Sequence, residues 1–412
     1  MLKNCQSYKD YIPSTNKINV MREIILEGPI SRADLSRKLG LSVPSVMSLT
    51  ENLIDLGLVH AVGKGKSRCG KRPELLDVVA DSEYYMGVDI GRGSVRIAIM
   101  NLCREQVFGK IVETGEVDPA EAFVERLSDL ILSCIEESKI EVNNLIGVGI
   151  AMPGLIERNT GHVLFSPDFG WNDIPLQNWL QMRLPYTILV ENSNRAMALA
   201  ECQWRGEMAP SNPRTSLCVN LGHGIGGAIL NSGRLYYGAS GTSGEIGHIT
   251  VVKDGPLCAC GNRGCLEAVA SGDAIARQGR DAVADGLDTC LREWVGENVN
   301  AVTAKQVFRA AMLGDAVALS IVDKAVDYIG IGLAMAVNIL DMDSIVLCGG
   351  LTKNGEFFFD KVVKSVKKRQ MKHAGRQVSM SMGTRGDYGT AIGAALFLAH
   401  DGWRVPKLKH YY

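Results

Sequence analysis

Three cysteines and a histidine in the middle of the chain are spaced to bind one metal ion. Cys258, Cys260 and Cys265 lie within eight residues among glycines that let the backbone fold back, and His248 precedes them by ten. Cysteine and histidine ligands in this number are typical of tetrahedral zinc. Cysteines also serve as small buried apolar side chains, but the other eight cysteines are scattered singly. The spacing therefore predicts a zinc site at these four residues.

The same stretch, residues 244–267, resembles the signature of the ROK family of repressors, open reading frames and sugar kinases. The family carries G-E-x-G-H followed by C-x-C-G-x-x-G-C-x-E, and every fixed position is filled here. In the family the zinc loop is structural and the glutamates beside it hydrogen-bond sugar hydroxyls. The resemblance therefore implies that Glu245, His248 and Glu267 line a sugar pocket.

Length and composition favour a globular protein of more than one domain. The chain has 412 residues, of which 46% are hydrophobic and 22% charged, which suits two or three domains. We expect no membrane segment, because no apolar run reaches eighteen residues, and the N-terminus lacks an apolar signal core. Eleven cysteines, an odd number, suit a reducing compartment, so we expect a cytoplasmic protein.

Charge is distributed unevenly along the chain. Residues 1–80 carry 12 Lys+Arg and 8 Asp+Glu, whereas the remainder carries 32 and 37. The front is therefore basic and the rest acidic. This asymmetry is weak evidence alone, but it fits a nucleic-acid-binding module joined to a different domain.

The pattern of residues 1–80 predicts a winged helix-turn-helix. Helical spacing predicts a first helix over residues 17–26, a second after the capping residue Ser31, and a third after Ser42. The third helix would bury an apolar stripe and present short polar side chains on its outer face, as a recognition helix in a major groove does. The residues that we expect to contact DNA from it are Ser42, Pro44, Ser45 and Ser48.

Two predicted strands after that helix form a basic wing. Its tip, residues 63–73, holds five basic side chains and no acidic one, which suits phosphates or a narrow minor groove. Winged helices also bind proteins, and lysines in a turn are often merely solvated, but the order of helix, turn and basic wing favours operator DNA. The wing residues that we expect to contact DNA are Lys64, Lys66, Arg68, Lys71 and Arg72.

The body reads as two α/β lobes. Strand clusters near residues 85–115 and 217–252 are each followed by helices, and the resemblance names their fold as the two-lobed actin-like, ribonuclease-H-like ATPase fold. We expect domains at residues 1–80 (winged helix-turn-helix), 81–200 (first lobe) and 201–412 (second lobe with the zinc loop, and C-terminal helices returning to the first).

Residues 155–184 read as an aromatic, loop-rich stretch whose rings either stack on a sugar or fill the core.

The positions that perform catalysis in the family's kinases are altered. Where those kinases carry an aspartate that takes the proton from the sugar hydroxyl, this chain has Ser193, which cannot act as a general base without a partner. In the first phosphate loop Asp89 remains, but Arg92 and Ser94 replace a glycine and a lysine, and in the second loop His223 replaces a threonine. Asn192 can still form hydrogen bonds with a sugar. The resemblance thus implies sugar recognition without kinase activity.

These observations predict a transcriptional regulator, a repressor of a carbohydrate-use operon controlled by a sugar or sugar phosphate. A homodimer or homotetramer would place recognition helices in successive major grooves, about 34 Å or a multiple apart. One alternative is a sugar kinase fused to a DNA-binding domain. Another is a repressor held by a protein of the sugar phosphotransferase system, as one branch of the family is; nothing in the sequence excludes it.

Overall fold

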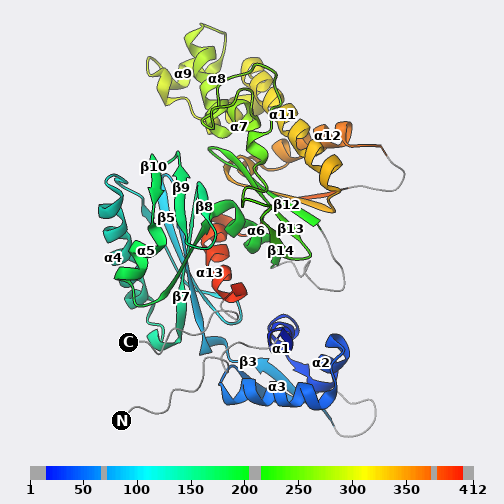
Figure 1. Cartoon of the computed structure of the whole chain (residues 1–412). Helices are drawn as coiled ribbons and strands as arrows, with labels where there is room; N and C mark the ends of the chain where they lie inside the picture. The colour runs from blue at the N-terminus through cyan, green and yellow to red at the C-terminus, as the bar shows by residue number, and fades with distance from the viewer. Residues whose placement is uncertain (1–14, 66–71, 204–214, 373–377, 402–412) are drawn as a thin grey trace. The chain divides into compact units, whose positions relative to one another are not determined.

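The computed structural model describes residues 15–65, 72–203, 215–372 and 378–401, and these fall into two compact units (Figure 1). Unit 1 comprises residues 1–196 and 387–412, and unit 2 comprises residues 197–386. The chain therefore passes from unit 1 into unit 2 and returns near its end.

The N-terminal head of unit 1 is the predicted winged helix. Its elements are α1 (Thr15–Glu27), β1 (Ile30–Ser31), α2 (Arg32–Leu39), α3 (Val43–Asp55), β2 (Val59–Lys64) and β3 (Glu74–Val78), with the strands in the order β1-β3-β2. Ser31 caps α2 by accepting from Asp34 N, Gly40 ends it in the left-handed conformation, and Ser42 caps α3 by accepting from Ser45 N. The two helix starts expected from the capping residues Ser31 and Ser42 are confirmed.

A mixed five-stranded sheet forms the lobe of unit 1. Its strands are β4 (Tyr84–Ile90), β5 (Ser94–Asn101), β6 (Gln106–Glu113), β7 (Leu145–Met152) and β11 (Thr187–Asn192), in the order β11-β7-β4-β5-β6. The first three pair antiparallel, while β7 and β11 join them in parallel. Every residue of β4 is buried and all but Asp89 are apolar or aromatic, and β7 is an almost fully buried apolar run, as a sheet covered on both faces requires.

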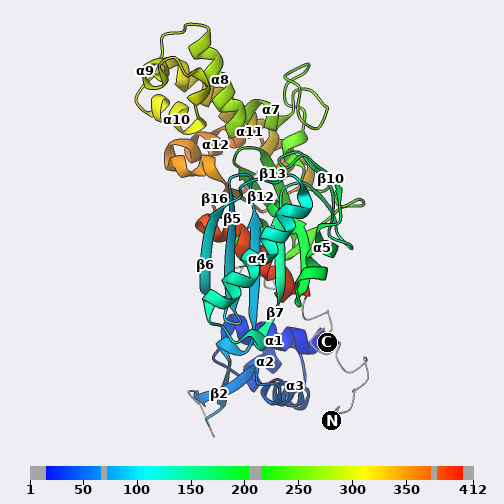
Figure 2. The ribbon, with the colours of Figure 1, turned by 90° about the vertical axis from the view of Figure 1, so that its left-hand side faces the viewer.

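Helices cover both faces of this sheet. Figure 2 shows α4 (Ala120–Ser138) and α5 (Leu176–Arg183) on one face and α13 (Gly389–Asp401) on the other. The last helix packs closely, because a Cβ on Gly87 would lie 1.8 Å from Ala391 O and one on Gly149 would lie 2.0 Å from Ala394 O. The C-terminal helix thus completes unit 1 where only glycine fits beneath it.

Unit 2 repeats the same sheet topology. Its strands are β12 (Thr215–Leu221), β13 (Ile225–Asn231), β14 (Arg234–Tyr236), β15 (Ser344–Cys348) and β16 (Ser379–Met382), in the order β14-β13-β12-β15-β16. Again three consecutive strands pair antiparallel, while β15 joins β12 in parallel and β16 joins β15 in parallel. The expectation of two similar α/β lobes is confirmed.

Six α-helices of unit 2 lie between β14 and β16 in sequence. They are α7 (Leu266–Ala270), α8 (Gly272–Ala284), α9 (Cys290–Val295), α10 (Ala304–Met312), α11 (Ala316–Leu340) and α12 (Gly355–Arg369). Much of α11 is buried, and it runs beside α12, to which ion pairs join it: Asp323 to Lys361 at 2.7 Å and Asp327 to Arg369 at 2.6 Å. Within the described ranges no helix is both long and apolar enough to cross a membrane.

The expectation of a loop-rich stretch over residues 155–184 is wrong. It forms a three-stranded antiparallel sheet of β8 (Leu155–Glu157), β9 (His162–Ser166) and β10 (Trp171–Ile174), followed by α5. Phe169 and Trp171 are buried and pack with their ring centroids 5.3 Å apart. These two aromatic residues therefore fill the core. The strands were not recognised in the sequence because segments this short carry too few residues to show an alternation of apolar and polar side chains.

Candidate functional site

The four predicted metal ligands lie together in unit 2. The ligand atoms of His248, Cys258, Cys260 and Cys265 are all within 4.8 Å of one another. Cys258 Sγ is 3.6 Å from His248 Nδ1, and Cys260 Sγ is 3.7 Å from Cys265 Sγ. In a tetrahedron with zinc–sulfur bonds of about 2.3 Å, neighbouring sulfurs are about 3.8 Å apart. The donor set and its spacing therefore fit a zinc ion.

Backbone pairing explains how the loop returns to the histidine. Val251 N donates to Gly264 O and Leu266 N donates to Ile249 O, both at 2.9 Å, so the segment after His248 lies against Cys265. Gly264 has a φ of +70°, and a Cβ there would lie 1.7 Å from Val252 O. The left-handed glycine is thus required for the return, as the glycine-rich spacing predicts.

Glu267 links the metal cluster to the glycine turn between β12 and β13. Its Oε2 accepts from Ile225 N at 2.9 Å, and its Oε1 lies 4.0 Å from Cys258 Sγ. A Cβ on Gly224 would lie 2.4 Å from Oε2, so the turn has no space for a side chain there. Oε1 and the remaining lone pairs of Oε2 can still accept from a ligand.

Glu245 lies beside the face of His248 that points away from the cysteines. Its Oε2 is 3.9 Å from His248 Nε2, whereas Nδ1 faces Cys258. One imidazole can therefore hold a metal through Nδ1 and present Nε2 toward a ligand. The structure brings together three of the four predicted sugar-site residues, Glu245, His248 and Glu267.

The fourth, Asn192, lies in unit 1 at the end of β11, where its carboxamide caps α6 (Ser193–Gln203). Asn192 Oδ1 accepts from Asn194 N at 2.9 Å, and its Nδ2 donates to Gly154 O at 2.9 Å. Beside it Glu191 and Arg195 form an ion pair of 2.7 Å whose side chains are 7% and 5% exposed. The capping role was missed from sequence, although asparagine before a helix is a recognised cap.

Asp89 is paired internally. It is buried, and its Oδ2 lies 3.1 Å from Arg96 Nη1 on the neighbouring strand. Burial raises the pKa of Asp89 from its ordinary value of 3.8 to about 6, and the attraction of Arg96 offsets only part of this. The Asp89 carboxylate is therefore held by an arginine of the same sheet.

Asp89→Asn is expected to change how stability depends on pH. The folded pKa exceeds the unfolded one, so this group's contribution to stability is present below about pH 3.8 and is lost as the pH rises through about 6. Removing the carboxylate removes that loss. The unfolding free energy of the variant relative to wild type should rise by about 2 kcal/mol between about pH 4.5 and pH 7.5. Urea unfolding at several pH values measures this difference in unfolding free energy, and Asp129→Asn, at an exposed position, is the control. A difference between Asp89→Asn and wild type that is the same at all pH values would contradict the prediction.

The second glycine loop carries an exposed imidazole. The His223 side chain is 80% exposed, and its Nδ1 lies 2.9 Å from Asp273 Oδ1 at the start of α8. Gly272 N donates to Gly222 O at 2.8 Å and Asp273 N donates to His223 O at 3.2 Å. The turn is thus joined to the N-terminus of α8 through both backbone and side chain.

The predicted DNA-contacting face of α3 is exposed. The buried side chains of this helix are Val46, Thr50 and Leu53, and the predicted contacts Ser42, Pro44, Ser45 and Ser48 all lie on its exposed surface. At the wing, Lys64 and Arg72 are exposed, and Gly65 N donates to Pro73 O at 2.8 Å to join its two strands. The other predicted wing contacts, Lys66, Arg68 and Lys71, lie outside the described residues.

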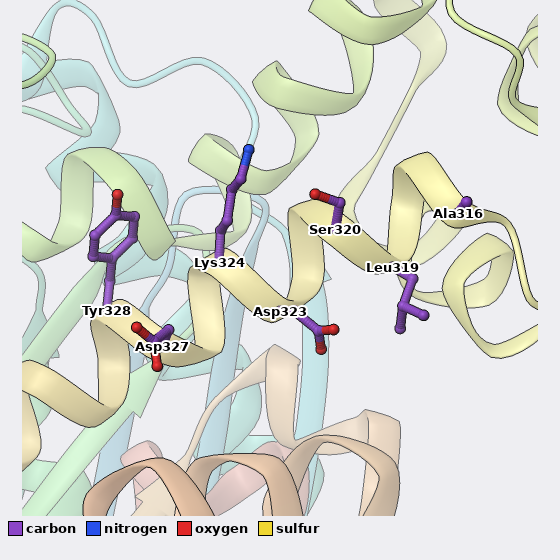
Figure 3. A pocket seen from close by; sticks show the side chains of 7 residues that line it. All are labelled: Ala316, Leu319, Ser320, Asp323, Lys324, Asp327 and Tyr328. Atoms are coloured by element: carbon purple, nitrogen blue, oxygen red, sulfur yellow. The ribbon is translucent and has the colours of Figure 1, made fainter. Parts of the chain in front are cut away.

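A surface depression of about 640 Å³ lies along α11 (Figure 3). Its lining consists of Ala316, Leu319, Ser320, Asp323, Lys324, Asp327 and Tyr328. All come from one helix, and none belongs to the zinc cluster or to the predicted sugar set. The two aspartates are already paired with α12, so this hollow is not the expected sugar site.

Comparison with known proteins separates the head from the body. The ROK family model matches residues 85–401, and a winged helix-turn-helix DNA-binding model matches residues 14–60. A xylose repressor of Caldicellulosiruptor bescii is 31% identical over 354 residues, covering 86% of this chain and 88% of that protein. A glucokinase of Halalkalibacterium halodurans is 34% identical over 285 residues, covering 69% of this chain and 84% of the kinase.

A solved structure extends the likeness over head and body together. A ROK family transcriptional regulator, a homologue of the Escherichia coli MLC protein, superposes with a TM-score of 0.79 at 26% identity, covering 95% of this chain and 96% of that one. The repressors thus match nearly the whole chain, whereas the kinase matches a smaller part. The expected fold, a winged helix-turn-helix joined to an actin-like body, is confirmed, and the chain belongs to the ROK family.

Proposed function

We propose that the chain is a sugar-responsive, DNA-binding transcriptional repressor. The observation that carries this is the winged helix with an exposed polar recognition face, joined in one chain to a ROK body whose relatives over most of its length include repressors. The proposal places the protein in the cytoplasm, where operator DNA is. Two copies would present two recognition helices to a palindromic operator.

The effector is a sugar or sugar phosphate held by Glu245, His248 and Glu267 in unit 2; Asn192, in unit 1, stays a separate prediction as a sugar ligand. Carboxylates accept from sugar hydroxyls, and His248 Nε2 donates to them when Nδ1 is bound to the metal. Zinc, held by His248 and the three cysteines, fixes the imidazole and the loop that bears Glu267. A sugar releases DNA only to the extent that it binds the released form more tightly.

Capture of genomic fragments tests the repressor directly. The purified protein is mixed with fragmented DNA of its source organism, with and without D-xylose, D-glucose, N-acetylglucosamine and their phosphates. We expect a palindromic site beside sugar-use genes to be enriched and then released by one of these compounds. Capture of no specific DNA would overturn the proposal.

Glu245→Gln is expected to weaken the responsive sugar by about tenfold or more, because a charged acceptor is lost from a hydrogen bond to a hydroxyl. Zinc content should be unchanged, since Glu245 is not a metal ligand. Calorimetric titration measures the affinity. Asp254→Asn, which neutralises an acid in the same zinc loop at a positive φ that asparagine tolerates, is the matched control. Equal losses in both variants would argue against a direct contact.

The runner-up, a sugar kinase with a DNA-binding head, has less support. Ser193 begins α6 where a kinase needs its base, Asp89 is paired with Arg96, and His223 is paired with Asp273. The similarity to a glucokinase is the observation that supports this alternative. Sugar-dependent ATP turnover by the purified protein would favour it, and we expect none.

Control by a phosphotransferase protein instead of a free sugar is the third candidate. The sugar titration separates the two, since a sequestered repressor need not bind any sugar. Sedimentation of the free protein and of its operator complex distinguishes dimer from tetramer.

A further inference from the structure

Glu201 is a buried carboxylate that none of the sites above uses. It lies near the C-terminal end of α6, is 3% exposed, and follows a run of buried small and apolar residues from Ala196 to Ala200. A carboxylate in such a place is costly unless donors surround it. The donors that reach Glu201 therefore show one part of the chain that it holds in place.

Three donors to Glu201 belong to one turn after β16. Thr384 N donates to both oxygens of Glu201 at 2.9 Å, and Arg385 N donates to Oε1 at 2.9 Å. Thr384 Oγ1 approaches Oε2 at 3.4 Å. A Cβ on Gly383 would lie 2.8 Å from Oε1, so the turn closes on the carboxylate with no side chain between them.

This contact joins the two places where the chain crosses between units. The first crossing lies inside α6, between Ala196 and Met197, and Glu201 follows it by little more than one helical turn. The second crossing lies between Gly386 and Asp387, directly after the turn that Glu201 holds. We call the segments around these two crossings the connections. Glu201 therefore joins both connections on the unit 2 side.

The same two connections are also in contact on the unit 1 side. A Cβ on Gly393 of α13 would lie 1.7 Å from Ala196 O of α6, so the two helices touch through backbone with no room for a methyl group. The connections are thus paired on both sides of the division, by close packing in unit 1 and by a buried charge in unit 2.

We propose that Glu201 is a clasp that makes the two connections act as one hinge, so that a change in unit 2 on sugar binding reaches the head-bearing unit 1 through both together. Glu201 is a positioning residue and touches neither sugar nor DNA. Its part in the sugar response rests on the proposed function, whereas the pairing of the connections does not.

Hydrogen exchange tests the pairing. In Glu201→Ala, amides 384 and 385 should exchange about tenfold faster or more, and so should amides in α6 after the crossing and at the start of α13. Glu201→Gln keeps one acceptor and should show the same pattern with smaller changes, which guards against misfolding of the alanine variant. The matched control is Asp315→Asn, because Asp315 also accepts from two backbone groups of unit 2, Ala318 N and Cys290 N. Faster exchange confined to 384 and 385 would overturn the clasp.

Coupling is measured with the compound that releases DNA from the wild type. The ratio of operator affinities without and with that compound should fall about tenfold toward unity in Glu201→Ala, while sugar affinity and sugar-free DNA affinity stay within about twofold. An unchanged ratio would overturn the coupling role. If no compound releases the wild type from DNA, the proposed effector fails, and the exchange pattern alone still decides the clasp.

Discussion

Cys260→Ser is expected to abolish zinc binding and to lower the melting temperature of unit 2 by about 10 °C or more. Cys260 is the exposed member of the cluster, so the change removes a ligand without opening a cavity. Three remaining donors hold zinc poorly, and structural zinc contributes on the order of 10 kcal/mol in small zinc-dependent folds. Because Glu267 and His248 are positioned by this loop, the response to sugar should be lost as well.

Elemental analysis and calorimetry measure the two effects. Wild-type protein should carry about one zinc per chain, and removing it with a chelator should reproduce the shift in melting temperature. Cys103→Ser is the control, since Cys103 lies outside the cluster and is only partly exposed. Carefully prepared wild-type protein without zinc, or a Cys260→Ser variant that melts with the wild type, would refute the metal site.

Ser48→Asp is expected to weaken operator binding by about 100-fold while leaving the fold intact. Ser48 is exposed on α3, so a carboxylate there costs the folded protein little. In a major groove the same carboxylate would face base acceptors and lie near phosphates, and the serine contact would be lost. Fluorescence anisotropy with the captured operator at fixed salt measures the affinity.

The control for this variant is Asn172→Asp, which adds the same charge at an exposed position of β10, in the lobe of unit 1 and outside the head. Its operator affinity should change by less than about twofold, because a distant charge is screened beyond about 10 Å. If Ser48→Asp binds the operator like the wild type, α3 is not the recognition helix.

Local patterns made much of this molecule predictable. Ser31, Gly40 and Ser42 set the ends of the head helices through caps that involve only nearby residues, and the metal cluster was visible because three of its ligands lie within eight residues. Such features need no knowledge of which distant segments meet. The same is true of β7, whose apolar run identifies a buried strand.

Distant contacts were not predictable. Nothing in the sequence near Glu267 indicates that it accepts from Ile225, or that Glu201 accepts from Thr384, 183 residues away. An acid in an alanine-rich helix, as at Glu201, is the sign that could have raised the question. Asn192 was interpreted only as a sugar ligand, although its place before α6 also suited a cap.

The position of α13 has a consequence for the order in which the protein forms during synthesis. Unit 2 is continuous from residue 197 to 386, whereas unit 1 requires its last helix to cover β4 and β7. The nascent chain therefore completes unit 2 first and leaves one apolar sheet face of unit 1 uncovered until residues 389–401 have been made. We expect a chain cut short before residue 389 to carry an intact head on an aggregation-prone lobe, so a full-length product is a condition for a working regulator.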